Sequence, residues 1–434
     1  MPVKPKPSSR NPWYWIPSLY FAEGLPYVFV MTVSVIMYKR LDISNAQIAL
    51  YTSWLYLPWV IKPLWSPVVE ILKTKRYWII VMQLVVGASL AGIAFTLPAD
   101  RFFQYTIAFF WLLAFSSATH DIAADGFYML GLSERDQAFF VGIRNTFYRF
   151  AMLAGQGPLV IIAGKMEKIS GNNIQWAWSI TFYIFAALFL AFFIWHFFIL
   201  PRPVSDVRRE TRSVKQVFND FLDTFITFFK KEGIVLSLIF ILVFRLGEAQ
   251  LLKMASPFFL DNRDVGGLGL STSNIGFIYG TAGIIALTLG GIVGGIAVSR
   301  KGLKFWMLPM VLAMNLPNLM YVFLAFSQPE SLWIITASVV IEQFGYGFGF
   351  TAFMLYMIYI SQGQHKTAHY ALCTGFMALG MMLPGMISGW VQEMIGYRNF
   401  FIYVMICTIP GFIIINFLNY DPHFGTKSEK NAKH

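Results

Sequence analysis

The stretch SSATHDIAADGFYML (residues 116–130), followed by FFVGIRNTFYRFAMLAGQ (residues 139–156), decides the fold of this chain. Each part belongs to an apolar run long enough to be a membrane span, yet each carries ionisable side chains. An ionised group inside a bilayer is costly, so it indicates a functional site. The stretch therefore predicts a polar site within the membrane. Its buried charges are Asp121, Asp125, Arg144 and Arg149.

The composition of the whole chain is that of a polytopic membrane protein. The 434 residues are 57% hydrophobic and 13% charged, whereas soluble proteins contain about 25% charged residues. Apolar blocks of about 20 residues recur, which is the length of a helix that crosses a hydrocarbon core of about 30 Å. Alternating strand patterns are absent, so a transmembrane barrel is disfavoured. We predict an all-α membrane protein.

Polar breaks separate twelve predicted spans, and Lys and Arg concentrate in one set of alternating loops. By the positive-inside rule, both termini are expected in the cytoplasm. The longest break divides the chain into an N-terminal six-helix bundle (1–200), a cytoplasmic linker (201–232) and a C-terminal six-helix bundle (233–434). The spans are expected at about 13–38, 45–71, 77–98, 103–130, 137–163, 176–199, 233–260, 272–298, 303–326, 331–361, 367–394 and 399–418.

The linker itself predicts one amphipathic helix. Ser213 to Gln216 has the form of a capping box, and several phenylalanines follow on one helical face. Such a helix is expected to lie flat on the inner leaflet and to join the two bundles.

Several classes of site and partner are excluded by the same reading. The net charge of +11 is explained by the cytoplasmic loops, so no nucleic-acid partner is expected. The two cysteines, Cys373 and Cys407, lie in different predicted spans and have no metal-binding spacing. No Walker A motif is present, so an ion gradient is the expected energy source. We expect no cofactor, no metal and a monomeric protein.

Two patterns indicate a transporter built from repeated halves. Residues 155–158 interrupt the fifth span with Gly and Pro, and residues 383–385 do so at nearly the same depth of the eleventh. The loop at residues 295–304 resembles the major facilitator signature Gly-x-x-x-Asp-Arg-x-Gly-Arg-Arg, with Ser299 at the acidic position. The expected fold is therefore that of the major facilitator superfamily.

The charged residues inside the spans are the candidate site residues. Asp121 and Asp125 are four residues apart, so their carboxylates are expected to be neighbours on one face of the helix. The candidates for proton coupling are Asp121, Asp125, Glu23, Glu342 and Glu248. The candidates for substrate binding are Lys62, Arg144, Arg149, Arg245, Asn145, Gln156, Tyr27, Tyr148, Tyr346 and Tyr356.

Structural alternatives remain open for several of these residues. An aspartate paired with Arg144 or Arg149 would lock two helices together, and Arg245 would pair with Glu248 three residues away. Glu23 and Glu342 have no basic residue in their own spans, and loss of hydration favours a neutral carboxyl group. Both are therefore expected to exchange protons. Lys253, near one end of the seventh span, is expected to snorkel to the interface.

The same segments resemble the AmpG-type muropeptide permeases along essentially the whole chain. The matching segments are FAEGLPY (21–27), KPLWSPVVE (62–70), HDIAADG (120–126), FYRFAML (147–153), FRLGEA (244–249), VVIEQFGYGFG (339–349), HYALCTGFMALG (369–380) and SGWVQEMIG (388–396).

The resemblance implies a proton-driven importer of N-acetylglucosaminyl-1,6-anhydro-N-acetylmuramic acid, with or without its peptide, in the bacterial inner membrane. It implies that Asp121, Asp125, Arg149, Lys62 and Glu342 occupy positions that the family also fills with like charges. Two alternatives stay open. One is a carrier of another bulky anion, such as acyl-coenzyme A or a metallophore. The other is an intramembrane transferase, which charges spread over both halves disfavour.

Overall fold

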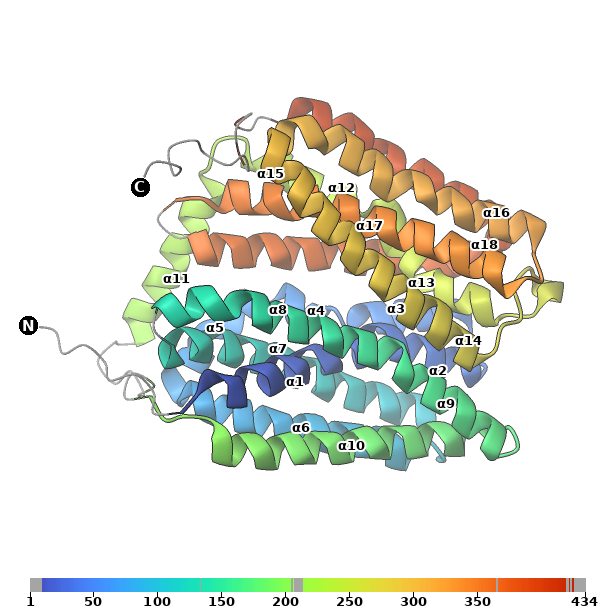
Figure 1. Cartoon of the computed structure of the whole chain (residues 1–434), viewed down its shortest axis with the longest axis horizontal. Helices are drawn as coiled ribbons and strands as arrows, with labels where there is room; N and C mark the ends of the chain where they lie inside the picture. The colour runs from blue at the N-terminus through green and yellow to red at the C-terminus, as the bar shows by residue number, and fades with distance from the viewer. Residues whose placement is uncertain are drawn as a thin grey trace, which may run out of the picture. The chain divides into compact units, whose positions relative to one another are not determined.

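The computed structural model describes residues 10–132, 134–203, 206, 214–363, 366–418, 421 and 424. All of the regular elements in these ranges are helices, which confirms the all-α prediction (Figure 1). The chain divides into two compact units, one made of Met1–Asp42 and Leu55–Phe221 and the other of Ile43–Trp54 and Leu222–His434.

The first unit contains the stretch that opened the sequence analysis. Two helices in it carry that stretch, α7 and α8, and α1 packs against α8. Its helices are α1 (Ile16–Val28), α2 (Ser34–Arg40), α4 (Leu57–Val60), α5 (Lys62–Leu72), α6 (Lys75–Thr96), α7 (Phe102–Gly131), α8 (Glu134–Gln156), α9 (Pro158–Ile169) and α10 (Ile174–Ile199).

The second unit includes one helix from the first half of the sequence. Helix α3 (Asn45–Trp54) packs against α18 (Lys366–Ile414), where the Asn45 amide donates to Gln392 Oε1 at 2.6 Å. The division of the chain at 201–232 stays a prediction. The other helices are α12 (Ile234–Phe244), α13 (Leu246–Leu260), α14 (Thr272–Ile275), α15 (Ile284–Asn315), α16 (Leu319–Ser327) and α17 (Leu332–Ser361).

The linker helix α11 (Val214–Phe229) begins in the first unit and ends in the second. A helix was expected in this segment, and its predicted cap at Ser213 lies outside the described residues. At its C-terminal end, Phe228 is fully buried in the core of the second unit.

Nine segments of the described chain are long and apolar enough to cross a membrane. Two of them, Thr272–Ser327 and Ala368–Phe417, contain 56 and 50 residues. Each is interrupted by a glycine with positive φ, namely Gly302 at 79° and Gly396 at 71°. Each therefore covers two predicted spans. The total of twelve and the cytoplasmic termini stay predictions.

The predicted spans differ from the helices where the chain bends. The second span, expected as one helix over residues 45–71, is divided into α3, α4 and α5. Pro58 and Pro63 each lie in the first turn of a new helix, because proline lacks the N–H that would continue the preceding helix. The fifth span likewise breaks between α8 and α9 at Gly157, as its Gly and Pro residues predicted.

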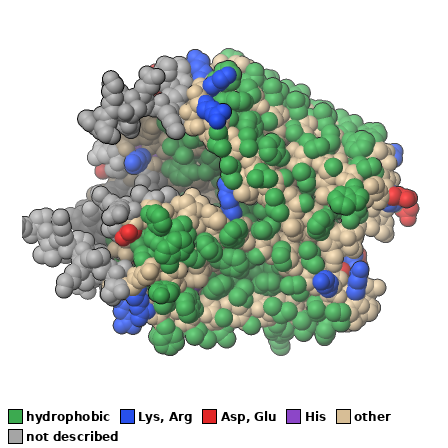
Figure 2. Space-filling view, viewed as in Figure 1, with side chains coloured by type: hydrophobic (Ala, Val, Ile, Leu, Met, Phe, Trp, Pro, Cys, Tyr) green, Lys and Arg blue, Asp and Glu red, His purple; other side chains and the backbone are tan. Residues whose placement is uncertain are grey.

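Hydrophobic side chains are spread across the face shown in Figure 2. Large exposed apolar residues include Phe95 and Trp333, which are 77% and 82% exposed. An apolar surface of this extent is destabilising in water and suits contact with lipid.

Candidate functional site

Three carboxyl groups meet in the first unit. Glu23 of α1 and Asp121 and Asp125 of α7 each place an oxygen within 4.8 Å of the others. Glu23 is only 7% exposed, and its Oε2 has no hydrogen-bond partner among the described residues. Carboxylates this close repel one another, which favours a proton on one of them.

Two cations lie beside these acids. Lys62 Nζ forms an ion pair with Asp121, and Arg144 Nη2 lies 2.9 Å from an oxygen of Asp125. Neither aspartate is therefore without a counter-charge, whereas Glu23 has no ion pair within the described residues. Lys62, Asp121 and Arg144 each keep about a quarter of their side-chain surface exposed.

One helix break and one small residue bring these groups together. Lys62 is the first residue of α5, so the break before that helix directs it toward α7. Gly24, next to Glu23, lets α1 approach α8 closely. A Cβ at Gly24 would lie 2.9 Å from both the Ala151 Cβ and the Tyr148 carbonyl oxygen. Each aspartate of α7 thus meets a cation from a neighbouring helix, Lys62 of α5 or Arg144 of α8.

Sequence reasoning missed two tyrosines that surround Arg144. Its Nη1 donates to the Tyr20 hydroxyl at 3.1 Å, and its guanidinium lies 4.6 Å from the Tyr20 ring centre and 5.0 Å from that of Tyr128. Such cation–π contacts hold the guanidinium in place. The signal was present, because Tyr20 precedes Glu23 and Tyr128 follows Asp125 by three residues, which places each pair on one helical face.

A chain of buried hydrogen bonds was also missed. Gln83 of α6 bonds His120 of α7 at 3.0 Å and His196 of α10 at 2.9 Å, and His196 bonds Ser18 of α1 at 2.9 Å. His196 and Gln83 are fully buried. The chain joins four helices and ends beside Asp121. These residues are far apart in sequence, so spacing alone gave no signal for them.

The remaining candidates of the first unit are more exposed or serve packing. Arg149 and Asn145 are exposed, and neither lies in an ion pair of the described chain. Tyr148 and Gln156 are half-buried. Tyr27 packs edge-on against Trp59 with ring centres 5.3 Å apart.

The second unit has its own charged pair. Arg245 lies at the break between α12 and α13 and binds Glu248 through two hydrogen bonds of 3.0 and 2.7 Å. It also donates to the Tyr346 hydroxyl at 2.8 Å. Both charged side chains are less than a tenth exposed. The pairing expected from their spacing is present, and Tyr346 extends it to α17.

Two other candidates in this unit have different surroundings. Glu342 is 1% exposed and accepts a hydrogen bond of 2.9 Å from the Gln343 amide, and no ion pair of the described residues includes it. Tyr356 lies in the hydrophobic core, where its hydroxyl is 2.8 Å from that of Ser237. Its position favours packing over contact with a solute.

The expectation that Lys253 snorkels to the interface is wrong. Its side chain is 4% exposed, and Nζ donates to Thr52 Oγ1 at 2.9 Å. Because α3 packs into this unit, its polar Thr52 is available to the ammonium group, and the sequence of α13 alone does not reveal that.

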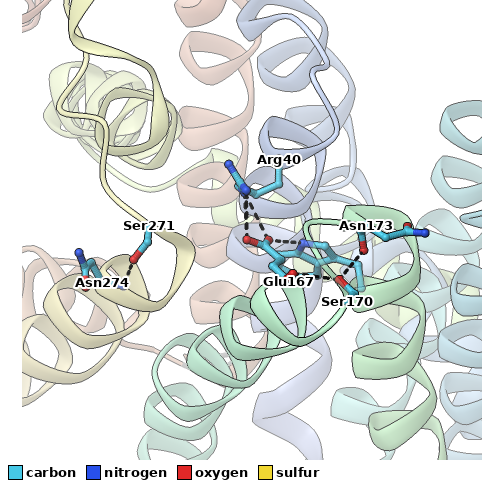
Figure 3. A network of polar contacts seen from close by, with 7 residues as sticks. Arg40, Glu167, Ser170, Asn173, Ser271 and Asn274 are labelled. Carbon is cyan, nitrogen blue, oxygen red and sulfur yellow. Dashed lines mark hydrogen bonds and ion pairs between the residues drawn. The ribbon is translucent and has the colours of Figure 1, made fainter.

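Glu167 is a buried acid outside the cluster, and its surroundings differ from those of the cluster. Glu167 of α9 is paired with Arg40 at 3.2 Å and accepts a hydrogen bond of 3.0 Å from the Trp178 indole (Figure 3). Arg40 compensates the charge of Glu167, and the ion pair joins the end of α2 to the end of α9. The Glu23, Asp121 and Asp125 set differs because Lys62 and Arg144 balance only two of its three acids.

Comparisons with known proteins agree with this architecture. A family model described as the Major Facilitator Superfamily matches residues 18–362. A Rickettsia conorii protein that carries the name AmpG 4 is 28% identical over 92% of this chain and 95% of its own. The anhydromuropeptide permease of Escherichia coli is 24% identical over 92% of this chain and 77% of its own.

Solved structures resemble the chain in fold. The nucleoside transporter NupG superposes with a TM-score of 0.67 at 17% identity, over 94% of this chain and 98% of its own. A D-xylose-proton symporter superposes with a TM-score of 0.68 at 9% identity, over 93% and 96%. The expected fold and the resemblance to AmpG-type proteins are confirmed.

Proposed function

Because the chain belongs to the Major Facilitator Superfamily, we propose that it is a proton-coupled importer of an anionic, wall-derived sugar such as an anhydromuropeptide. The chain is a multi-pass transporter of the inner membrane and not an enzyme. The choice of solute is supported by the similarity to the Escherichia coli anhydromuropeptide permease. The choice of the proton is supported by the acids in the first unit.

The observation that carries the proposal is the charge balance of that cluster. Glu23, Asp121 and Asp125 lie within 4.8 Å of one another, and Lys62 and Arg144 compensate two of the three. Like charges this close repel strongly where water is scarce. One proton on the acids balances the set, and Glu23 is its holder because it has no cation of its own.

The same arrangement couples the proton to an anion. A carboxylate of the solute that binds Lys62 draws the ammonium group away from Asp121. Asp121 then lacks its counter-charge and shares the proton of Glu23. Binding of the anion therefore favours binding of the proton, and linkage makes the effect reciprocal. Exposed Arg149 and half-buried Tyr148 offer further contacts to the sugar or its peptide.

In this scheme the second unit contributes a different set of charges. Arg245 is held by Glu248 and Tyr346, and a solute anion can compete with Glu248 for it. The solute and the proton then cross the membrane together by alternating access.

The proposal is tested in proteoliposomes with an imposed pH gradient. Labelled N-acetylglucosaminyl-1,6-anhydro-N-acetylmuramic acid is expected to accumulate, and a protonophore is expected to abolish accumulation. Accumulation that survives the protonophore contradicts proton coupling. Preferential uptake of acyl-coenzyme A or a metallophore from the same panel contradicts the choice of solute and supports another anion as cargo.

A further inference from the structure

A cavity of about 510 Å³ lies at one end of the first unit, where α6 begins and α10 ends. Three arginines, Arg10, Arg76 and Arg202, line it together with apolar residues at the end of α10. No acidic residue is among the described residues that line the cavity. It takes no part in the transport scheme above.

Two of the arginines are fixed in place by the end of α10. Arg76 donates to the carbonyl oxygens of Phe197 and Leu200, the latter at 3.4 Å, and Arg10 donates to that of Phe198. Orphan carbonyls at a helix C-terminus attract cations. A guanidinium carries five N–H donors, so donors of both side chains remain for another acceptor.

One nearby carboxylate, Asp206, attracts Arg76 and can balance only one of the three positive charges. Asp206 accepts hydrogen bonds from the backbone N–H groups of Lys75 at 2.7 Å and Arg76 at 3.0 Å, so it binds the first turn of α6. Arg10 and Arg202 are close enough to repel the charge of Arg76. An anion in the cavity relieves this repulsion.

The surroundings of the cavity indicate where such an anion comes from. Phe197 and Phe198 in its wall are 46% and 67% exposed, and the adjacent Trp195 is 47% exposed. Exposed aromatic residues next to clustered arginines suit the boundary between headgroups and acyl chains. The arginines also lie in or beside segments that the positive-inside rule assigns to the cytoplasm, where basic pockets bind anionic lipid.

We propose that this cavity binds the phosphate group of an anionic phospholipid of the inner leaflet. The arginines donate to the phosphate oxygens, a geometry that guanidinium groups favour, and the exposed aromatic residues contact the acyl chains. The site is independent of the transported solute. A free phosphate ion has the same chemistry at its oxygens but no chain to contact Phe197 or Phe198, so the two sources are distinguishable.

The test compares lipid retention of three full-length proteins by native mass spectrometry in mixed phosphatidylglycerol and phosphatidylcholine. The test variant is Arg10→Gln with Arg202→Gln, because both side chains are exposed and the capping Arg76 is kept. The control is Arg300→Gln with Lys304→Gln, which removes two exposed cations of the second unit. Equal thermal midpoints in neutral lipid establish that all three proteins fold.

Wild type and control are expected to retain phosphatidylglycerol in preference to phosphatidylcholine. The test variant is expected to bind it on the order of 20-fold more weakly, because each basic residue beside an anionic headgroup contributes roughly a fivefold change in affinity. Equal retention by the test variant and wild type overturns the proposal. A second measurement compares the thermal midpoint of wild type in neutral lipid after addition of inorganic phosphate or of phosphatidylglycerol. An equal rise with both overturns the assignment to lipid.

Discussion

Glu23 differs from the two aspartates beside it because it has no cation of its own. Replacing it by glutamine removes the site at which we place the proton and keeps the size of the side chain. Gradient-driven uptake is expected to fall on the order of tenfold, as in typical couplings between two ligands. Exchange of labelled for unlabelled solute is expected to continue, because it needs no net proton movement. Loss of both activities contradicts this role for Glu23.

The ion pair of Arg144 with Asp125 either only holds α7 and α8 together or also takes part in transport, and substitutions can distinguish these two roles. Arg144→Gln is expected to lower the free energy of unfolding by about 2 kcal/mol, because a charged hydrogen-bond partner of Asp125 is lost. The exchange Asp125→Arg with Arg144→Asp is expected to restore most of this stability without restoring uptake. Uptake and thermal midpoints are measured for both variants. If the exchanged pair also recovers uptake, the contact serves only to hold the two helices together.

At the level of single residues, sequence spacing predicted which groups would be neighbours along one helix. Asp121 with Asp125 and Arg245 with Glu248 follow from three- and four-residue periodicity. The partners across helices did not follow, because spacing left both Arg144 and Arg149 available to the aspartates. Tyr20 decides in favour of Arg144, since it comes from α1 and holds the guanidinium beside Asp125.

At the level of helices, Gly24 sets the distance between α1 and α8. Gly24→Ala places a methyl group 2.9 Å from the Ala151 Cβ and from a backbone oxygen, so the helices must separate. We expect a loss of about 1–3 kcal/mol in stability, typical of overpacking. The matched control is Gly142→Ala in α8, where nothing lies within 4 Å of the added Cβ. Equal thermal midpoints for the two variants contradict the close contact.

The Gln83 chain is the other feature that joins helices. Gln83→Leu leaves His120 and His196 without their amide partner in a buried site, which is expected to cost about 2–4 kcal/mol. Ser18→Ala, at the end of this hydrogen-bond chain, removes only one of its bonds and is expected to cost less. Thermal midpoints of the two variants in the same detergent test this order. The reverse order contradicts a central role for Gln83.

Helix boundaries were predictable where apolar length alone decides them, and less so where the chain bends. The third, fourth and sixth spans agree closely with α6, α7 and α10. The second span was expected as one helix, although Pro58 and Pro63 were visible in the sequence. The placement of α3 in the second unit depends on contacts with α18, which no local pattern reveals.

At the level of the whole molecule, each unit carries its own set of charges. The first has three acids with two cations. The second has the ion pair of Arg245 with Glu248, and it also has Glu342, a buried acid of α17. Because the charge of the first unit is unequal, we propose that the proton enters the transport cycle there. The composition and the periodicity of the spans predicted this kind of transporter. The charge balance could be worked out only from the structure, because it depends on which cation pairs with which acid.

The most direct test of that claim is the pH inside proteoliposomes, followed with a trapped dye while solute is added outside. Wild type is expected to acidify the lumen as the anhydro-disaccharide enters. The control is Glu167→Gln, which changes a buried acid paired outside the cluster. It is expected to acidify the lumen at the wild-type ratio of proton to solute, whatever its rate of uptake. Glu23→Gln is expected to admit labelled solute in exchange for unlabelled solute loaded inside, without acidification. Acidification by Glu23→Gln at the wild-type ratio of proton to solute contradicts the central claim.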